Sequence, residues 1–230
     1  MRDELVGVSS AGLLRLLQIA SPALPIGAFA YSHGLEAAVA NGWVDGSASA
    51  ASWIEGILSH SLAGCDVPVL ARVYRAMERR DAGEAKAWND WLFAARSTLE
   101  LRSEDRQVGA ALARLLVSLG VREAAPFCDD PLTTYASVFA TAAVAWRIPL
   151  EAASLAFLLS WAEAQVSAAV RLVPLGQTEG QRILSDLQPA IERAVRGGLA
   201  RADDEIGAGL AGHAIASALH ETQYTRLFRS

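Results

Sequence analysis

The sequence predicts an all-α protein that folds as a single compact bundle of about ten helices. Apolar residues recur at spacings of three, four and seven positions, which places them on one face of a helix. No window shows the alternation of apolar and polar residues that a half-buried strand requires, and no Asn-Gly turn joins two strand-like runs. Helix-breaking residues divide the chain into segments of ordinary helix length.

Each predicted helix lies between Pro, Gly or Asn residues that end helices. The clearest apolar faces are Leu155, Leu158, Leu159, Ala162, Val166, Ala169 and Val170 in one segment, and Val108, Leu112, Leu115 and Leu119 in an earlier one. The breakers are, in chain order, Pro22 and Pro25, Asn41 to Gly46, Gly64 to Pro68, Asp81 to Gly83, Gly120 to Pro131, Pro149, Pro174 to Gly176, Pro189, and Gly197 to Gly198. Because the connections are short, we expect one domain over residues 1–230.

Composition excludes several classes of protein. Hydrophobic residues make up 52% of the 230 residues and charged residues 20%, a balance that excludes a disordered chain. The net charge of −5 offers no basic footprint for nucleic acid. Cys65 and Cys128 form no disulfide framework or CxxC motif, and the N-terminus, MRDELVGVSS, does not resemble a secretory signal. We therefore expect a cytoplasmic protein.

Two apolar stretches raise the question of a membrane span. Residues 16–35 carry no charge and are long enough to cross a bilayer, but Pro22, Pro25 and Gly27 interrupt a continuous helix. Residues 131–146 are uncharged but shorter than a span requires. We expect no membrane partner, and the acidic charge also disfavours a peripheral membrane protein.

The histidines His33, His60, His213 and His220 are the candidates for a metal site. His213 and His220 are seven positions apart, on one helix face but too distant to chelate a single ion. HExxH, GxSxG and Gly-Lys-Ser/Thr motifs are absent from the sequence. We therefore predict no catalytic residue, no cofactor and no metal site. The alternative is a helical metal-dependent hydrolase, in which separated His and acidic residues would converge.

The charge-rich stretch from Arg96 to Arg106 offers two ion pairs at helical spacing. Arg96 is followed by Glu100 four positions on, and Arg102 by Asp105 three positions on. Pairs of this kind usually lie on a solvated helix face. We expect an exposed, ion-paired face here, with an interaction surface as the alternative.

Two segments differ from this helical background. LLQIASPALPIGAFAYSHGLE, residues 16–36, contains Pro25 and Gly27, which restrict and turn the backbone, followed by Phe29, Tyr31 and His33. HETQYTRLFRS, residues 220–230, combines aromatic, leucine and arginine side chains. Aromatic and arginine residues are enriched at protein interfaces. These segments therefore indicate a surface shaped to meet a partner.

Together with RSTLELRSED and SAAVRLVPLGQTEGQ, these two segments resemble the urease accessory protein family UreF, in order along nearly the whole chain. The resemblance implies an all-α protein, commonly dimeric, that is not an enzyme. It implies assembly with UreD, called UreH in some organisms, and with the nickel-carrying GTPase UreG on apo-urease. There UreF is expected to modulate GTP hydrolysis and to promote lysine carbamylation and nickel delivery. Ala30 and Thr225 depart from the family pattern, where serine is usual, and both are conservative in size.

We expect the Pro-rich loop, about residues 21–30, and the C-terminal tail, about residues 221–230, to contribute to one partner-facing surface. Its expected members are Pro25, Gly27, Phe29, Tyr31, His33, His220, Tyr224, Arg226, Leu227, Phe228 and Arg229. The Tyr31 hydroxyl is expected to accept a hydrogen bond from Arg226. Two alternatives stay open: the loop is a buried helix connection with Phe29 and Tyr31 in the core, or the tail folds back on its own bundle.

Overall fold

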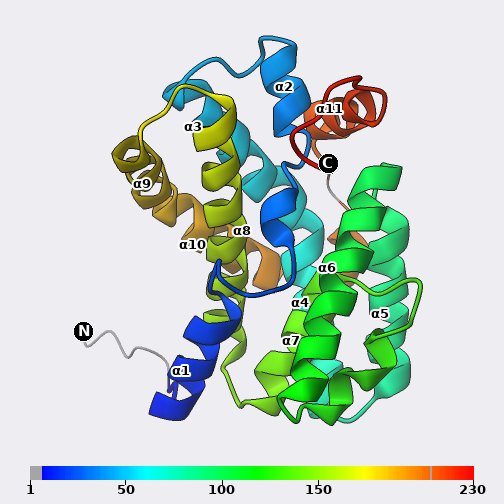
Figure 1. The fold of residues 1–230 in the computed structure, drawn as a ribbon. Helices are drawn as coiled ribbons and strands as arrows, with labels where there is room; N and C mark the ends of the chain where they lie inside the picture. Colours follow the sequence, from blue (N-terminus) through cyan, green and yellow to red (C-terminus); the bar gives the residue numbers. More distant parts are fainter. Residues whose placement is uncertain (1–6, 208) are drawn as a thin grey trace.

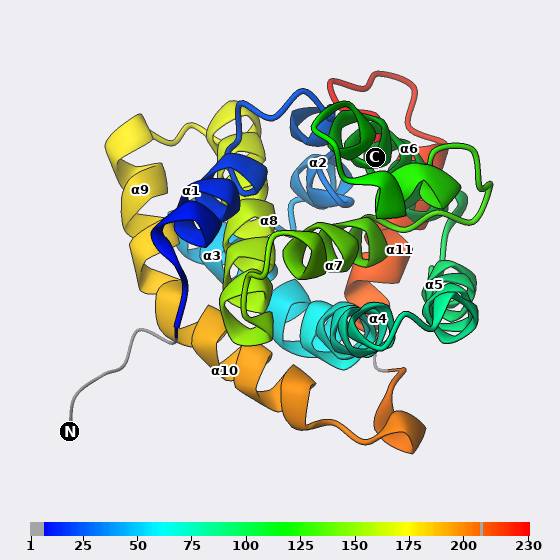
Figure 2. The same ribbon diagram turned by 90° about the horizontal axis from the view of Figure 1, so that it is seen from below.

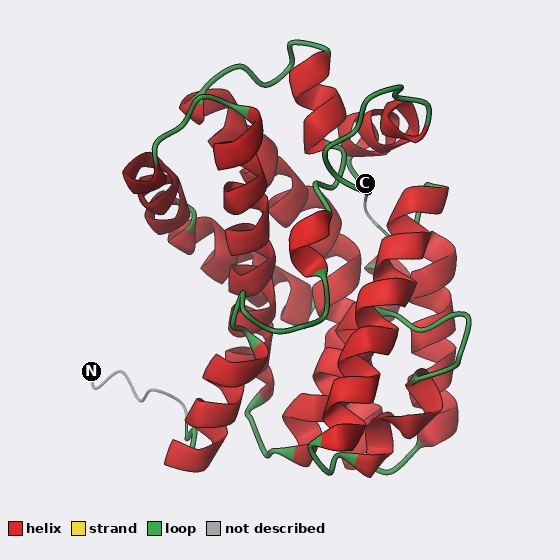
Figure 3. Ribbon diagram, in the orientation of Figure 1, coloured by secondary structure: helices red, strands yellow, loops and turns green. Residues whose placement is uncertain are grey.

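Helices form all the regular secondary structure of the computed structural model, which describes residues 7–207 and 209–230 (Figures 1 and 3). The α-helices are α1 (Ser10–Ile19), α2 (Leu35–Ala40), α3 (Ser47–Ile57), α4 (Val67–Glu78), α5 (Ala82–Ala95), α6 (Leu99–Ser118), α7 (Tyr135–Ala145), α8 (Leu150–Leu172), α9 (Gln177–Asp186), α10 (Gln188–Ala200) and α11 (Ala211–Glu221). A π-helix, η2 (Leu58–Asp66), and three 3-10 helices, η1 (Ala28–Ala30), η3 (Arg122–Phe127) and η4 (Asp203–Glu205), complete the set. No strand occurs in these ranges, so the predicted all-α class is confirmed.

Polar side chains fix where several helices begin. Thr98 accepts a hydrogen bond from the backbone N–H of Leu101 at the start of α6, and Thr134 accepts one from Ser137 at the start of α7. Each bond satisfies a backbone donor that the first helical turn leaves without a partner. The extended backbone at Arg96 and Thr98 separates α5 from α6, so the chain changes direction there.

The core forms where α4, α7 and α8 meet. α7 packs between α4 and α6, while α8 contacts α3, α7 and α10 (Figure 2). Phe139 of α7 and Phe157 of α8 are buried with ring centroids 5.5 Å apart. Tyr135 lies 5.8 Å from the first ring and 5.4 Å from the second. Each buried ring stabilises the fold by ~1.5–3 kcal/mol and so fixes α7 against α8.

The apolar sequence of α8 follows from this central position. Among the described residues, α8 is the one helix with the length and apolar composition to cross a membrane, with a mean hydropathy of 1.3. Within the fold 56% of that window is buried, as in a core helix. Residues 16–35 are broken into the end of α1, a loop and η1, and residues 131–146 contain α7.

α2, α11 and the C-terminal tail meet at one end of the molecule, and the loop before α2 lies nearer its middle (Figure 1). α2 and α11 lie against each other there, and α11 also contacts α6. The C-terminal tail, drawn in red in Figure 1, returns from the end of α11 toward α2 and the start of α6. The first and last thirds of the chain therefore contribute to the same region.

Gly109 allows α6 to approach the start of α7. A Cβ atom at this position would lie 2.8 Å from Thr133 Cγ2 and 2.9 Å from the carbonyl carbon of Thr134. Both threonines are buried, so neither has free space into which it can move. The contact therefore requires glycine.

We predict that Gly109→Ala lowers the free energy of unfolding by about 1–3 kcal/mol, because the added methyl group overpacks the contact between α6 and α7. Gly197→Ala is the matched control, since Gly197 is exposed on α10 and open space surrounds its Cα. Alanine should stabilise the helix there by about 0.5–1 kcal/mol. Urea denaturation followed by circular dichroism measures both effects, and equal changes in the two variants would contradict the close approach.

Candidate partner-binding site

The loop between α1 and α2 turns where its glycine predicts. Gly27 has a φ of 78°, a left-handed conformation that glycine adopts without steric cost. Ile26 beside it is buried, whereas Pro25 is exposed and Phe29 is 60% exposed. The loop therefore displays Phe29 to solvent, so the alternative that placed Phe29 and Tyr31 in the core is wrong for Phe29 and right for Tyr31.

Tyr31, in contrast, lies beneath the surface and is 4% exposed. Its hydroxyl donates to Gln107 Oε1 at 2.9 Å, and Arg229 Nη1 donates to the same oxygen at 3.3 Å. Burial raises the pKa of the Tyr31 phenol. The predicted bond between Arg226 and Tyr31 is wrong, because Arg226 Nη1 donates to Glu100 Oε1 at 2.9 Å. Glu100 and Gln107 are two turns apart on α6, so the two arginines reach different turns of that helix.

His33 lies where the loop enters α2, with a φ of 51°. Its Nε2 is 2.7 Å from Glu104 Oε1 and 3.2 Å from Trp161 Nε1. In the 3.2 Å contact Trp161 Nε1–H is the donor and His33 Nε2 the acceptor, because an indole nitrogen only donates. The ring also stacks on His213, with centroids 5.9 Å apart. His33 is thus enclosed by side chains and supports the loop from within.

The Glu36 carboxylate holds the tail. Oε1 accepts the backbone N–H of Leu227 at 2.7 Å, and Oε2 accepts that of Phe228 at 2.8 Å. Glu36 is 7% exposed, and a carboxylate buried to that extent is strongly destabilising unless donors surround it. The Phe228 ring packs into an apolar cluster with Leu35 and Val44. The carboxylate therefore fixes Leu227 and Phe228 by their backbone, and apolar burial also fixes Phe228.

His220 is fully buried between two carboxylates. Its Nδ1 lies 2.8 Å from Glu100 Oε2, and its Nε2 lies 3.3 Å from Glu36 Oε2. His220 was expected among the partner-facing residues, but the structure places it below the tail. His213 is also buried on α11, so the two histidines share one face, as their spacing predicts.

The tail pairs with the loop through backbone hydrogen bonds. The N–H of Arg229 donates to the carbonyl of Ala30 at 2.8 Å, and the N–H of Ser32 donates to the carbonyl of Ser230 at 2.6 Å. The Ser230 hydroxyl also donates to Glu104 Oε2 at 2.9 Å. The tail therefore folds back on its own bundle, the second alternative, and lies beside the loop in one region.

The charged stretch from Arg96 to Arg106 is exposed only in part: Arg102 and Arg106 face water as expected, but Asp105 is buried and Arg96 is half-buried against it. Arg96 Nη1 donates to Asp66 Oδ2 at 3.0 Å, and Arg96 Nε donates to Asp105 Oδ2 at 2.8 Å. Burial raises the pKa of Asp105, although the Arg96 guanidinium opposes that shift. The predicted pair with Glu100 is absent because Arg96 and Glu100 do not belong to one continuous helix. Arg102 instead donates to the carbonyl of Arg96 at 3.0 Å.

Exposed apolar side chains occur on the tail, on η1, at the start of α6 and on α11. With the two tail arginines they form what we call the tail surface: Phe29, Leu99, Ile215, Leu219, Tyr224, Arg226, Leu227 and Arg229. Five of these residues belong to the predicted partner-facing set, whereas Leu99, Ile215 and Leu219 do not. The four-residue spacing of Ile215 and Leu219 was a usable signal, because it marks an apolar stripe on α11.

The described part of the chain gathers no group of three or more His, Cys, Asp or Glu side chains that could hold a metal ion. Cys65 is buried and Cys128 is half-buried, and the two thiols form no disulfide.

Comparison with known proteins agrees with the resemblance. The family model UreF matches residues 44–188. The urease accessory protein UreF of Alkalilimnicola ehrlichii is 53% identical over 216 residues, which cover 94% of this chain and 95% of the relative. The chain belongs to the UreF family. The urease accessory proteins UreF of Chromohalobacter salexigens and Marinobacter nauticus are 49% and 46% identical, and each alignment covers 95% of this chain and 94% of the relative.

We predict that Glu36→Gln loosens the tail, because the amide loses the charge that strengthens its bonds to Leu227 and Phe228. Bonds to a charged acceptor contribute about 1.5–3 kcal/mol, so exchange of these two amide hydrogens should accelerate by about tenfold or more. Hydrogen exchange resolved by NMR measures this, with Glu192→Gln on the exposed face of α10 as control. Unchanged protection in Glu36→Gln would show that Glu36 does not hold the tail.

His213 makes folding stability depend on pH. Burial, with smaller effects of His33 and Arg96, lowers the pKa of His213 to about 3. An unfolded histidine titrates near pH 6.5, so below that pH the unfolded chain binds a proton that the folded chain excludes. The free energy of unfolding should therefore fall between pH 6.5 and about 3, by about 1.4 kcal/mol per pH unit from this group.

The substitution His213→Phe keeps a flat ring at this position and removes the group that takes up the proton. Between pH 7.5 and 5.5 the variant should lose about 1 kcal/mol less stability than the unaltered protein. Urea denaturation at the two pH values measures the difference. The same loss in both proteins would mean that His213 is not held neutral.

Proposed function

We propose that this protein is a non-catalytic scaffold in urease maturation, located in the cytoplasm. It joins UreD/UreH and the GTPase UreG on apo-urease, acts there as a homodimer, modulates GTP hydrolysis and promotes nickel delivery. Membership of the UreF family supports the role in urease maturation. The tail surface is the observation on this chain that carries the binding role.

The tail surface has the chemistry of an interface. Tyr224 is fully exposed, and Leu227 and Phe29 are 65% and 60% exposed, which leaves a large apolar area in water. Burying such side chains against a partner is favourable, and arginines beside them supply charged hydrogen bonds. A second protein is the occupant that this mixture fits best.

Preorganisation adds to affinity at such a surface. Glu36, His220 and Glu100 hold the tail from below, so its residues lose less conformational entropy when a partner binds. We therefore propose two roles for the expected site residues. Phe29, Tyr224, Arg226, Leu227 and Arg229 contact the partner, while Pro25, Gly27, Tyr31, His33, His220 and Phe228 position them.

The hydrolase alternative gains no support from the described residues. It required histidines and carboxylates to converge, yet His33 and His220 each pair with glutamates in separate contacts. No specific observation favours a second function over the scaffold.

We predict that the double substitution Tyr224→Ala with Leu227→Ala weakens binding to UreD/UreH by about tenfold or more, because it removes two exposed anchors. Co-expression with UreD/UreH and UreG, followed by size exclusion with light scattering, measures the complex. Val117→Ala removes an exposed apolar side chain near the other end of α6 and should leave the complex intact. An unchanged complex in the double variant would remove the tail surface as the binding site.

A further inference from the structure

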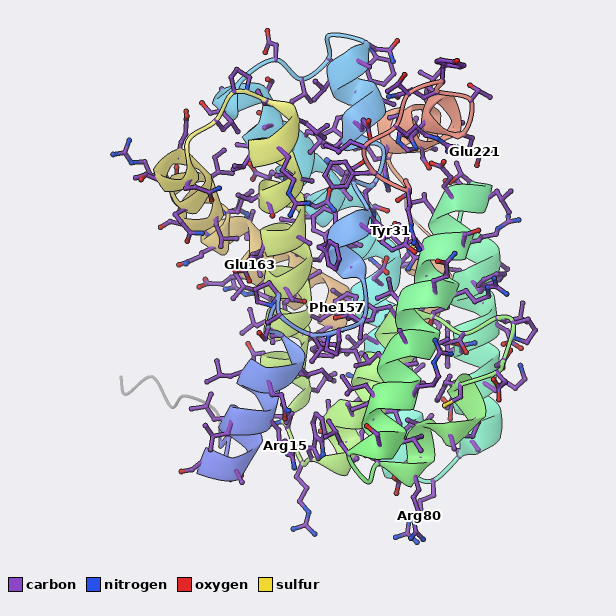
Figure 4. All side chains as sticks on the ribbon, viewed as in Figure 1. Arg15, Tyr31, Arg80, Phe157, Glu163 and Glu221 are labelled. Atoms are coloured by element: carbon purple, nitrogen blue, oxygen red, sulfur yellow. The ribbon has the colours of Figure 1, made fainter. Side chains whose placement is uncertain are left out.

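A groove of about 550 Å³ lies beside the tail surface, along α6. Its lining comes from the loop between Ile26 and Tyr31, from α6, from residues 128–131 before α7, and from Arg229 of the tail. Tyr31, labelled in Figure 4, lies between the loop and α6. Phe29 and Arg229 belong both to the groove and to the tail surface, so the two are continuous.

Three arginines line the groove, and all three are exposed. Arg106 and Arg114 both belong to α6 and lie about two turns apart, which places them on the same side of the helix. The tail supplies the third, Arg229, from the other end of the groove lining in sequence. Packing of the tail against α6 therefore gathers the three charges.

The three guanidinium groups keep most of their N–H donors for a ligand. Arg114 uses Nη1 for a contact of 3.4 Å to the carbonyl of Cys128, and Arg229 uses Nη1 for one of 3.3 Å to Gln107 Oε1. Arg106 makes no hydrogen bond or ion pair with any other residue that the structure describes. Since a guanidinium carries several donors and no acceptor, the groove favours a ligand rich in acceptors.

The carboxylates of the groove do not balance this charge. Asp130 is already engaged, because Lys86 Nζ lies 3.3 Å from its Oδ2 and its Oδ1 accepts the backbone N–H of Leu132 at 2.9 Å. Asp129 is the other carboxylate of the lining, and it offsets one of the three arginines. The groove therefore keeps an excess of positive charge on a chain whose net charge is −5.

Charge and position together select the occupant. Arginine binds carboxylates through paired N–H donors, so the excess charge fits aspartate and glutamate side chains. The exposed Phe29 ring and Pro131 lie in the same lining and offer apolar contact. Because the groove is continuous with the tail surface, a protein that covers the tail surface also reaches the groove.

We propose that this groove binds an acidic segment of the protein partner that covers the tail surface. Arg106 and Arg229 bind carboxylates of that segment, Arg114 adds attraction, and Phe29 packs against an apolar side chain between them. This proposal rests on the proposed binding role of the tail surface and adds the charge that the partner must carry.

Charge reversal on α6 tests the proposal, because Arg106 and Arg114 lie outside the tail surface. Arg106→Glu with Arg114→Glu should slow association with UreD/UreH by at least about tenfold at ~0.1 M salt, since like charges then meet. At ~1 M salt the difference should shrink to less than about threefold, because the Debye length falls from about 10 Å to about 3 Å. Surface plasmon resonance with the full chain measures the rates.

The matched control is Arg182→Glu with Arg196→Glu, which changes the net charge by the same amount on exposed positions of α9 and α10. Its association rate should stay within about twofold of that of the unaltered protein. Melting temperatures check the fold of each variant. If the reversed variant melts lower than the control, Arg106→Gln with Arg114→Gln replaces it, and this neutral pair should still slow association by about threefold.

A photo-cross-linker identifies the segment in the groove. Asp129→p-benzoylphenylalanine carries the reactive group at an exposed position of the lining, and Glu192→p-benzoylphenylalanine on α10 is the control. We expect the first variant alone to cross-link a UreD/UreH peptide in which Asp and Glu outnumber Lys and Arg. A cross-link to a peptide of the opposite charge balance, or none within an intact complex, would overturn the proposal.

The outcomes separate this proposal from the binding role on which it rests. If Tyr224→Ala with Leu227→Ala breaks the complex while charge reversal leaves the association rate unchanged, the tail surface stands and the acidic segment is wrong. If neither variant changes the complex, both proposals are wrong. Displacement of UreD/UreH by inorganic phosphate at constant ionic strength would assign the groove to a small anion and also overturn the proposal.

Discussion

The buried carboxylate of Glu36 is the interaction on which the candidate binding region depends. Its two oxygens accept the N–H groups of consecutive tail residues, Leu227 and Phe228, and it also lies beside His220. Because the donors are backbone groups, the carboxylate fixes the register of the tail. With this register Phe228 and Ser230 are buried, whereas Leu227 and Arg229 face water.

Helix α6 also holds the loop and the tail, through polar side chains on one of its faces. Glu100 contacts His220 and Arg226, Glu104 contacts His33 and Ser230, and Gln107 contacts Tyr31 and Arg229. These α6 side chains are four and three positions apart, the spacing that aligns side chains on a helix. Loop and tail are thereby attached to the same helix in register. That common attachment makes their exposed residues one surface.

Patterns within a single segment of the sequence predicted the features that this segment forms by itself. Gly27 predicted the turn, and the spacing of His213 and His220 predicted their shared helix face. Phe29 of the loop and Tyr224 and Leu227 of the tail are exposed, while the interface that the composition of these segments indicates stays a prediction. The prediction failed where a side chain had to choose among distant partners. Arg226 bonds Glu100 instead of Tyr31, and Arg96 bonds Asp66 and Asp105 instead of Glu100.

The sequence by itself determined the all-α class, the break in the chain at the Pro-rich loop and the membership of the UreF family. These properties follow from spacings and motifs that are read within a few turns of backbone. The tertiary structure decided which residues of the loop and tail face water, and it brought the arginines of α6 and the tail to one groove. Glu36 and Phe228 are 192 positions apart, and no local spacing encodes their contact. Such contacts depend on how the helices pack, because only packing determines which buried charge meets which donor.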